Sequence, residues 1–96
     1  MIADILLPII RRAILDLLLD IGGEENDDVL AILLAELGHR VARIDVAAQL
    51  EWLALRNLVI IEQVGPFNVA RSTHTGRDVA AGKLRVEGVS RHKTGE

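Results

Sequence analysis

The first part of the chain repeats its non-apolar residues with the period of an α-helix. From about Asp4 to Ile21, the positions that carry Asp, Pro or Arg are 4, 8, 11, 12, 16 and 20, and nearly all others are Ile, Leu or Ala. This pattern predicts a helix whose apolar arc exceeds the roughly 100° stripe that one packing face requires. We expect Pro8 to lie in the opening turn and Gly22-Gly23 to end the helix.

Two further helices are predicted in the middle of the chain. The polar run Glu24-Glu25-Asn26-Asp27-Asp28 is expected to be a loop ending in capping residues, and a short helix then runs from Val29 to Leu37. After a brief turn at residues 39–43, a third helix is predicted from Ile44 to Asn57. One face of this third helix carries Val46, Leu50, Leu53 and Asn57 at helical spacing.

A β-hairpin and a short helix are predicted to follow. Residues 58–64 are rich in β-branched side chains and end at Gly65-Pro66, and the alternating residues 67–73 come directly afterwards. The segment from Thr75 to Gly82 predicts a short closing helix with Thr75 as its cap and Gly82 as its end. Residues 83–96 are polar and lack periodicity, so we expect a loosely held C-terminal tail.

This order of elements is that of a winged helix-turn-helix fold. We therefore expect a mainly α protein with a small β-hairpin, built from a three-helix core, a two-stranded wing and a short C-terminal helix. The third helix would occupy the recognition position. Residues 1–82 would form the winged-helix domain, and residues 83–96 would form its polar tail.

The amount of apolar surface predicts self-association. The chain has 96 residues, enough for one domain, and 50% of them are hydrophobic. That fraction is high for so small a monomer, and surplus apolar surface usually ends at a subunit interface. Because the first helix has more apolar surface than one domain can cover, we expect a homodimer through that helix.

Several classes of protein are excluded by the composition. The chain has no Cys, so it has neither disulfides nor thiolate zinc sites, and its three His residues are too scattered for a metal site. Because no catalytic motif or phosphate-binding loop is found, we expect neither enzymatic activity nor a cofactor. No signal peptide is visible and charges interrupt the first apolar run, so we expect no membrane span and a cytoplasmic location.

Charge is unevenly distributed along the chain. Residues 1–36 contain two Arg and eight Asp or Glu, a net charge of −6, whereas residues 37–96 contain nine Lys or Arg and six Asp or Glu, a net charge of +3. Positive charge thus collects in the part of the chain where a nucleic-acid-binding surface would need it. Solvated surface charge alone would produce the same modest excess.

Two segments resemble those of winged-helix regulators. Leu50-Glu51-Trp52-Leu53-Ala54-Leu55-Arg56-Asn57-Leu58-Val59 resembles the end of a recognition helix leading into a wing. The run from Val69 to Gly82 is similar to a second wing strand entering a Thr-x-x-Gly helix start. The whole chain also resembles a group of short, uncharacterised proteins encoded in Mu-like prophages. This resemblance implies a winged-helix fold and a phage origin, and it supplies neither catalytic residues nor an established ligand.

The leading hypothesis is a DNA-binding protein of prophage type, acting in regulation or in another phage DNA transaction. The residues expected to contact double-stranded DNA are Arg40, Arg43, Gln49 and Arg56, with Arg71 and Arg77 supporting from the wing. The turn before the third helix is the stronger part of this surface, because a helix N-terminus also favours phosphate. The outward side of that helix is weaker, since it also carries Asp45, Glu51 and apolar residues.

The alternative hypothesis is a protein-interaction module in phage assembly or DNA packaging. Trp52 and Leu55 would then form the partner interface, because they lie on the outward half of the third helix and Trp is enriched at binding hot spots. In so small a chain, however, a lone Trp more often packs partly under the wing. The sequence leaves these two readings of Trp52 open.

Overall fold

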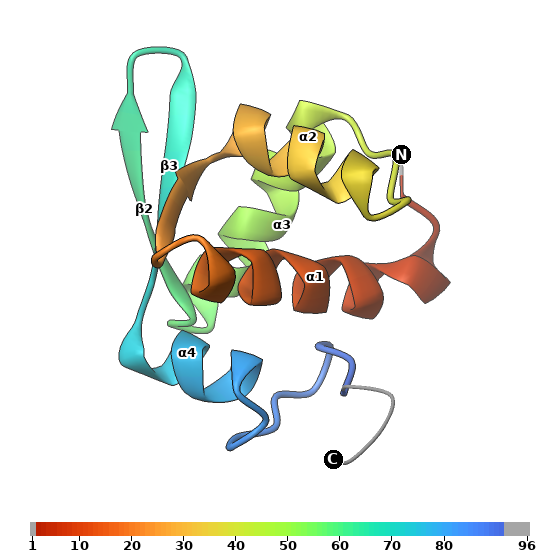
Figure 1. The fold of residues 1–96 in the computed structure, drawn as a ribbon, viewed down its shortest axis with the longest axis vertical. Helices are drawn as coiled ribbons and strands as arrows, with labels where there is room; N and C mark the ends of the chain where they lie inside the picture. The colour runs from red at the N-terminus through yellow and green to blue at the C-terminus, as the bar shows by residue number, and fades with distance from the viewer. Residues whose placement is uncertain (1, 92–96) are drawn as a thin grey trace.

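The computed structural model describes residues 2–91 of the chain. These residues form four α-helices, a 3₁₀ turn and three strands (Figure 1). In chain order the elements are the 3₁₀ turn η1 (Asp4–Leu6), α1 (Leu7–Asp20), β1 (Glu24–Asn26), α2 (Asp27–Glu36), α3 (Arg43–Leu55), β2 (Val59–Val64), β3 (Phe67–Ser72) and α4 (His74–Ala80). The predicted helices and the hairpin are confirmed, with boundaries moved by a few residues.

The sheet has three strands, one more than the sequence predicted. Its order is β1-β3-β2, and both pairings are antiparallel. The segment expected to be a polar loop forms β1, in which Glu25 pairs with Ala70 of β3. Side-chain pattern did not predict this strand, because its pairing depends on the backbone groups along the free edge of β3. The two-stranded wing is therefore corrected to a three-stranded sheet.

Local side-chain bonds explain where the helices begin and end. Asn26 caps α2 by accepting a hydrogen bond from the backbone N–H of Val29 at 2.8 Å. Thr73 caps α4 in the same way, accepting from Gly76 N at 2.9 Å, so the predicted cap at Thr75 is wrong by two residues. Asn57 follows α3 with a φ of 61°, the left-handed conformation that ends helices.

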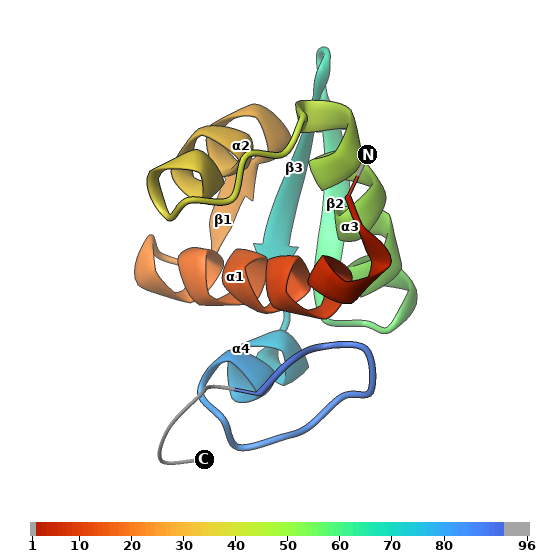
Figure 2. The same cartoon turned by 90° about the vertical axis from the view of Figure 1, so that its right-hand side faces the viewer.

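Helix α1 lies at the centre of the molecule. Figure 2 shows α2 and α3 on one side of it. On the other side lie α4 and the residues that follow it, 81–91, which we call the C-terminal segment. The fully buried residues of α1 include Ile10, Ile14, Leu15 and Leu18. The chain itself therefore covers both sides of the wide apolar arc that motivated the dimer prediction, which leaves only part of α1 available to a second copy.

The C-terminal segment packs against the core on the same side of α1 as α4. Val89 is buried and Val86 packs against the core cluster. Arg12, one of the periodic non-apolar positions of the first helix, is only 7% exposed and donates hydrogen bonds to the carbonyl oxygens of Ser90 and Ala80. The expectation of a loosely held tail is therefore wrong for the part that ends at Ser90, and residues 92–96 lie outside the described residues.

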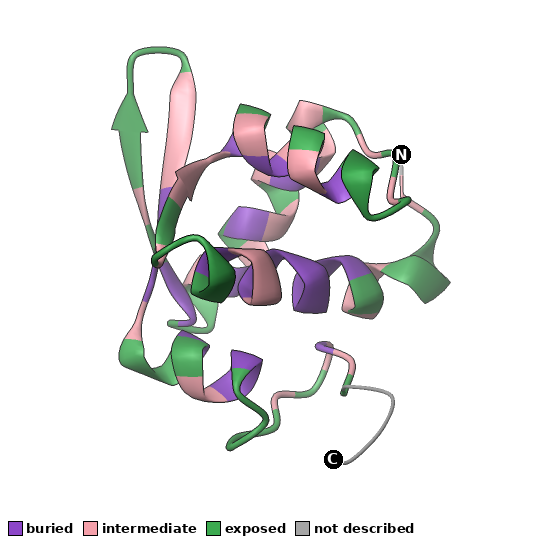
Figure 3. Cartoon of the chain, in the orientation of Figure 1, coloured by how far each residue is buried: buried purple, intermediate pink, exposed green. Residues whose placement is uncertain are grey.

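The core is built almost entirely from aliphatic side chains. Figure 3 shows where the buried residues lie along the helices and strands. Its largest fully buried members are Ile10, Ile14, Leu15, Leu18, Leu30, Leu34, Leu50, Leu53, Leu58, Val46, Val59 and Val79. Across residues 2–91, no helix has both the length and the apolarity needed to cross a bilayer. Within the same range, no group of three or more His, Asp or Glu is placed to hold a metal ion.

Candidate binding surface of helix α3

Helix α3 has one buried face and one open face. Val46, Leu50 and Leu53 are fully buried, as predicted. The opposite face carries Ile44, Ala48, Glu51 and Leu55, which are all exposed. Ile44 is 78% exposed and Leu55 is 82% exposed. Because these side chains are apolar or acidic, the open face carries no donor suited to a base edge or a phosphate.

A groove runs between α3 and the β2–β3 hairpin. One hollow in it has a volume of about 370 Å³ and is lined by Ala47, Glu51, Ala54, Leu55, Ile61, Gln63 and Asn68. A second hollow shares Ala47 and Asn68 with the first and extends toward the start of α3. Among the residues lining the first hollow, Glu51 is the only charged one, beside four apolar residues and the amides of Gln63 and Asn68. The second hollow is also lined by Asp27 and Arg43. The part of the groove beside Leu55 therefore combines apolar contacts with a single carboxylate.

At the start of α3, Arg43 is held by a buried carboxylate. Asp27 is 1% exposed, and its Oδ1 lies 3.3 Å from Arg43 Nε. Asn68 donates to the same carboxylate from its side-chain nitrogen at 2.9 Å and from its backbone nitrogen at 3.3 Å. Burial raises the pKa of Asp27, but these hydrogen bonds and the charge of Arg43 outweigh it, so the net pKa lies below the ordinary value.

Arg43 also reaches the tip of the hairpin. Its guanidinium donates to the carbonyl oxygen of Pro66 and lies 4.9 Å from the centre of the Phe67 ring. This side chain joins α3 and the β2–β3 hairpin to the N-terminus of α2. If Arg43 bound a DNA phosphate, its guanidinium would have to leave Asp27, Pro66 and the Phe67 ring.

At the other end of α3, Trp52 lies between two arginines. The guanidinium carbon of Arg11 is 3.8 Å from the ring centre and that of Arg56 is 3.5 Å from it. Arg56 also donates to the carbonyl oxygen of Trp52 at 3.0 Å. Burial, followed by repulsion from Arg56, lowers the pKa of Arg11. Trp52 is thus a partly buried side chain with a contact on each face of its ring.

The C-terminal segment covers this stack. Arg11 donates to the carbonyl oxygen of Gly88 at 3.0 Å and to Oε1 of Gln49 at 2.8 Å. Gly88 has a φ of 93°, and a Cβ atom there would lie 2.5 Å from the Trp52 ring. Trp52 therefore packs under the C-terminal segment rather than under the wing. Gln49, predicted to face outward, is half-buried and bonded within the chain.

The remaining predicted DNA contacts are spread over the molecule. Arg71 Nη1 lies 3.7 Å from a carboxylate oxygen of Glu24, and Arg77 donates to the carbonyl oxygen of Ser72 at 3.0 Å. Arg40 is exposed in the turn that leads into α3. Arg56 stacks on Trp52, and Gln49 is joined to Trp52 through Arg11. Arg43, at the start of α3, lies about 14 Å from Trp52 along the helix axis, at 1.5 Å per residue.

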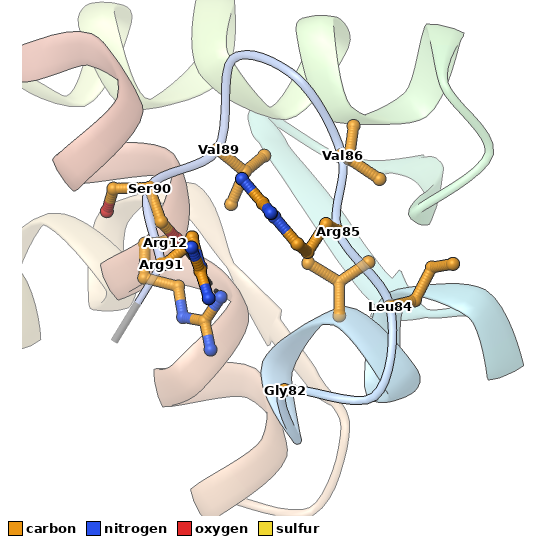
Figure 4. A pocket seen from close by; sticks show the side chains of 9 residues that line it. Arg12, Gly82, Leu84, Arg85, Val86, Val89, Ser90 and Arg91 are labelled. Carbon is orange, nitrogen blue, oxygen red and sulfur yellow. Dashed lines mark hydrogen bonds between the residues drawn. The ribbon is translucent and has the colours of Figure 1, made fainter. Parts of the chain in front are cut away.

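A small hollow beneath the C-terminal segment gathers three arginines. Figure 4 shows Arg12, Arg85 and Arg91 around it, and its volume is about 50 Å³. The Arg12 guanidinium is bonded to main-chain oxygens and forms an ion pair with Asp16 at 3.3 Å. The hollow has room for a few water molecules but not for a nucleotide. We interpret it as part of the packing of the segment.

Sequence reasoning missed Arg11, Asp27 and Gly88, which connect distant elements. A signal was present for Arg11, since a pair of arginines inside a nearly continuous apolar helix requires buried partners. Asp27 was expected only to favour the dipole of α2, a role that its place in the first turn also allows. Nothing local marked Gly88, because its close approach to Trp52 joins residues far apart in sequence.

The described residues define a small mixed α/β protein with four helices and a three-stranded antiparallel sheet, consistent with a winged helix. The chain is 43% identical over 91 residues to the uncharacterized protein gp26 of Escherichia phage Mu, and the match covers 95% of each chain. The chain belongs to the family of this Mu protein, which confirms the phage part of the resemblance. No family model matches the sequence.

Proposed function

We propose that this protein is a winged-helix protein whose α3 groove binds another phage-encoded protein. The fold assignment is supported by the order α1-β1-α2-α3-β2-β3, in which α2 and α3 precede a hairpin. The phage assignment of the partner is supported by membership in the Mu family. The kind of partner is inferred from the surface of α3, because α3 is the helix that contacts DNA bases in DNA-binding winged-helix proteins.

The observation that carries the proposal is the open face of α3. Its large apolar side chains, Ile44 and Leu55, are both exposed, and the exposed Glu51 between them would repel a phosphate. Residues 43–72, which span α3 and the hairpin, contain three Arg and three Asp or Glu. A neutral, apolar surface beside a groove is typical of a protein interface and lacks the positive charge that DNA binding requires.

The residues that line the groove indicate which side chains a partner would place in it. Ala47, Ala54 and Ile61 offer small or apolar contacts, and Glu51 offers a single negative charge. A complementary segment would place two or three apolar side chains in the groove and a Lys or Arg against Glu51. An amphipathic helix or an extended segment could present such a pattern.

A pairwise interaction screen against the other proteins of the phage would find the partner, followed by titration of purified components. We expect Leu55→Glu to weaken binding at least about tenfold, because it places a charge in an apolar contact. Ile32→Glu on α2 is the matched control, since Ile32 is 56% exposed and does not line the groove. Equal affinities for both variants would refute the proposed site.

DNA binding is the second candidate, and the position of Arg40 favours it. Arg40 is exposed and lies directly before the N-terminus of α3, where phosphates bind in helix-turn-helix proteins. If DNA is bound in this way, Arg40→Ala should lower the slope of log affinity against log salt by about one unit. An unchanged slope would remove Arg40 from the interface.

A further inference from the structure

We infer that two copies of this chain pair through α1 in an antiparallel arrangement, independently of the function proposed for α3. Every fourth position along this helix and its flanks is apolar, and these five residues form what we call the α1 ridge. They are Ile5, Ile9, Ala13, Leu17 and Ile21. Ile5 is 81% exposed, Ile9 41% and Ile21 40%, so the ridge stays open at both ends after the chain has covered the rest of α1.

The middle of the ridge lies in a groove. This groove has a volume of about 380 Å³ and is lined by Ile9, Arg12, Ala13, Asp16, Leu17, Asp20, Leu37 and His39. Leu37, at the end of α2, is 56% exposed and adds an apolar wall. Ala13, the smallest side chain of the ridge, is 9% exposed and lies at the floor of this groove.

The apolar ridge is self-complementary in an antiparallel pair. An antiparallel pair with its two-fold axis beside Ala13 sets Ile9 against the partner's Leu17 and Ile5 against the partner's Ile21. Every ridge position then meets an apolar residue, as an isologous interface requires. The helix dipoles also oppose each other in this arrangement, whereas a parallel pair would align them.

The charges beside the ridge have two opposite effects in this arrangement. Arg12 and Asp16 form an ion pair at 3.3 Å on one flank. Antiparallel pairing places this ion pair next to the same pair in reverse order, so each carboxylate approaches an opposite charge. Asp4 and Asp20 are exposed near the ends of the ridge and come close to each other across the interface. We therefore expect added salt to strengthen the dimer by screening these ends.

Analytical ultracentrifugation of the full chain tests the dimer. We expect dimers at micromolar concentration, and we expect Ile9→Glu to weaken association by roughly a hundredfold, because each dimer buries two copies of Ile9. Ile32→Glu is the control and should leave the dimer intact. Circular dichroism and a thermal melt of each variant would show that it is folded. A monomer at all concentrations, or a dimer that survives Ile9→Glu, would overturn the inference.

Cysteine cross-linking tests the direction of the helices, and the natural chain has no Cys to interfere. The double variant Ile9→Cys with Leu17→Cys should form a covalent dimer on mild oxidation. Ile9→Cys alone should not, because antiparallel pairing leaves the two copies of that position roughly 12 Å apart along the axis. A covalent dimer of the single variant at equal yield would contradict the antiparallel arrangement.

Discussion

Replacing Asp27 by Asn tests the role assigned to the buried carboxylate between α2, α3 and β3. The substitution keeps the shape of the side chain and removes its charge. The 2.9 Å bond from Asn68 Nδ2 loses its charge-assisted character, a difference of about 1 kcal/mol. The ion pair with the partly exposed Arg43 contributes about 1 kcal/mol more. We therefore expect Asp27→Asn to lower the free energy of unfolding by about 2 kcal/mol and Tm by about 8–16 °C.

The effect of this substitution should depend on pH. Because the pKa of Asp27 in the folded state lies below the unfolded value of about 3.9, its stabilisation is fully present above that value. It is lost as the pH falls through the folded-state pKa. The difference in unfolding free energy between the natural protein and Asp27→Asn should thus be constant near neutral pH and shrink in acid.

Urea denaturation followed by Trp52 fluorescence, at about pH 7 and about pH 2, measures both quantities. Asp28→Asn is the matched control, since Asp28 is exposed in the same first turn of α2 and should cost only about 0.3–1 kcal/mol. Equal costs for the two variants at neutral pH would refute the reasoning. A cost of Asp27→Asn that stayed the same in acid would also refute it.

Two glycines provide further predictions. Gly76→Ala should destabilise the protein by more than about 3 kcal/mol, because its Cβ would lie 2.0 Å from the carbonyl oxygen of Leu58; thermal melts compared with Thr75→Ala would measure this. Gly88→Ala should displace the C-terminal segment from Trp52, since its Cβ would meet the ring and its φ is positive. Acrylamide quenching of Trp52 fluorescence should then increase, and unchanged quenching would show that the segment does not cover the ring.

The sequence predicted those parts of the fold that depend on local periodicity. The i, i+3 and i+4 spacing of apolar residues located α1 and α3, and the β-branched runs around Gly65-Pro66 located the hairpin. Strand β1 was missed because Glu24 and Glu25 have low β-propensity and are ordered by their pairing with β3. Strand β1 thus depends on a tertiary contact, its pairing with β3, and not on its local sequence.

The candidate site was less predictable, because its side chains are held by residues distant in sequence. Arg43, Gln49 and Arg56 have the donors that DNA contacts need. The sequence could not show that, within the chain, Arg43 and Arg56 donate to carbonyl oxygens and Gln49 accepts from Arg11. Leu55 was correctly expected to be exposed, since it lies opposite the core face of α3. The pairing of Arg11 with Gln49 joins residues 38 positions apart, a contact that no single-sequence pattern encodes.

We propose that the open face of α3 binds protein and not DNA. Fluorescence anisotropy of a labelled duplex at about 50 mM salt tests it without knowledge of the partner. With dimer and fold verified, we expect no saturable binding up to about 10 µM protein, because non-specific DNA binding needs several neutralised phosphates. Saturable binding that weakens with salt by several units on a log–log plot would contradict the claim.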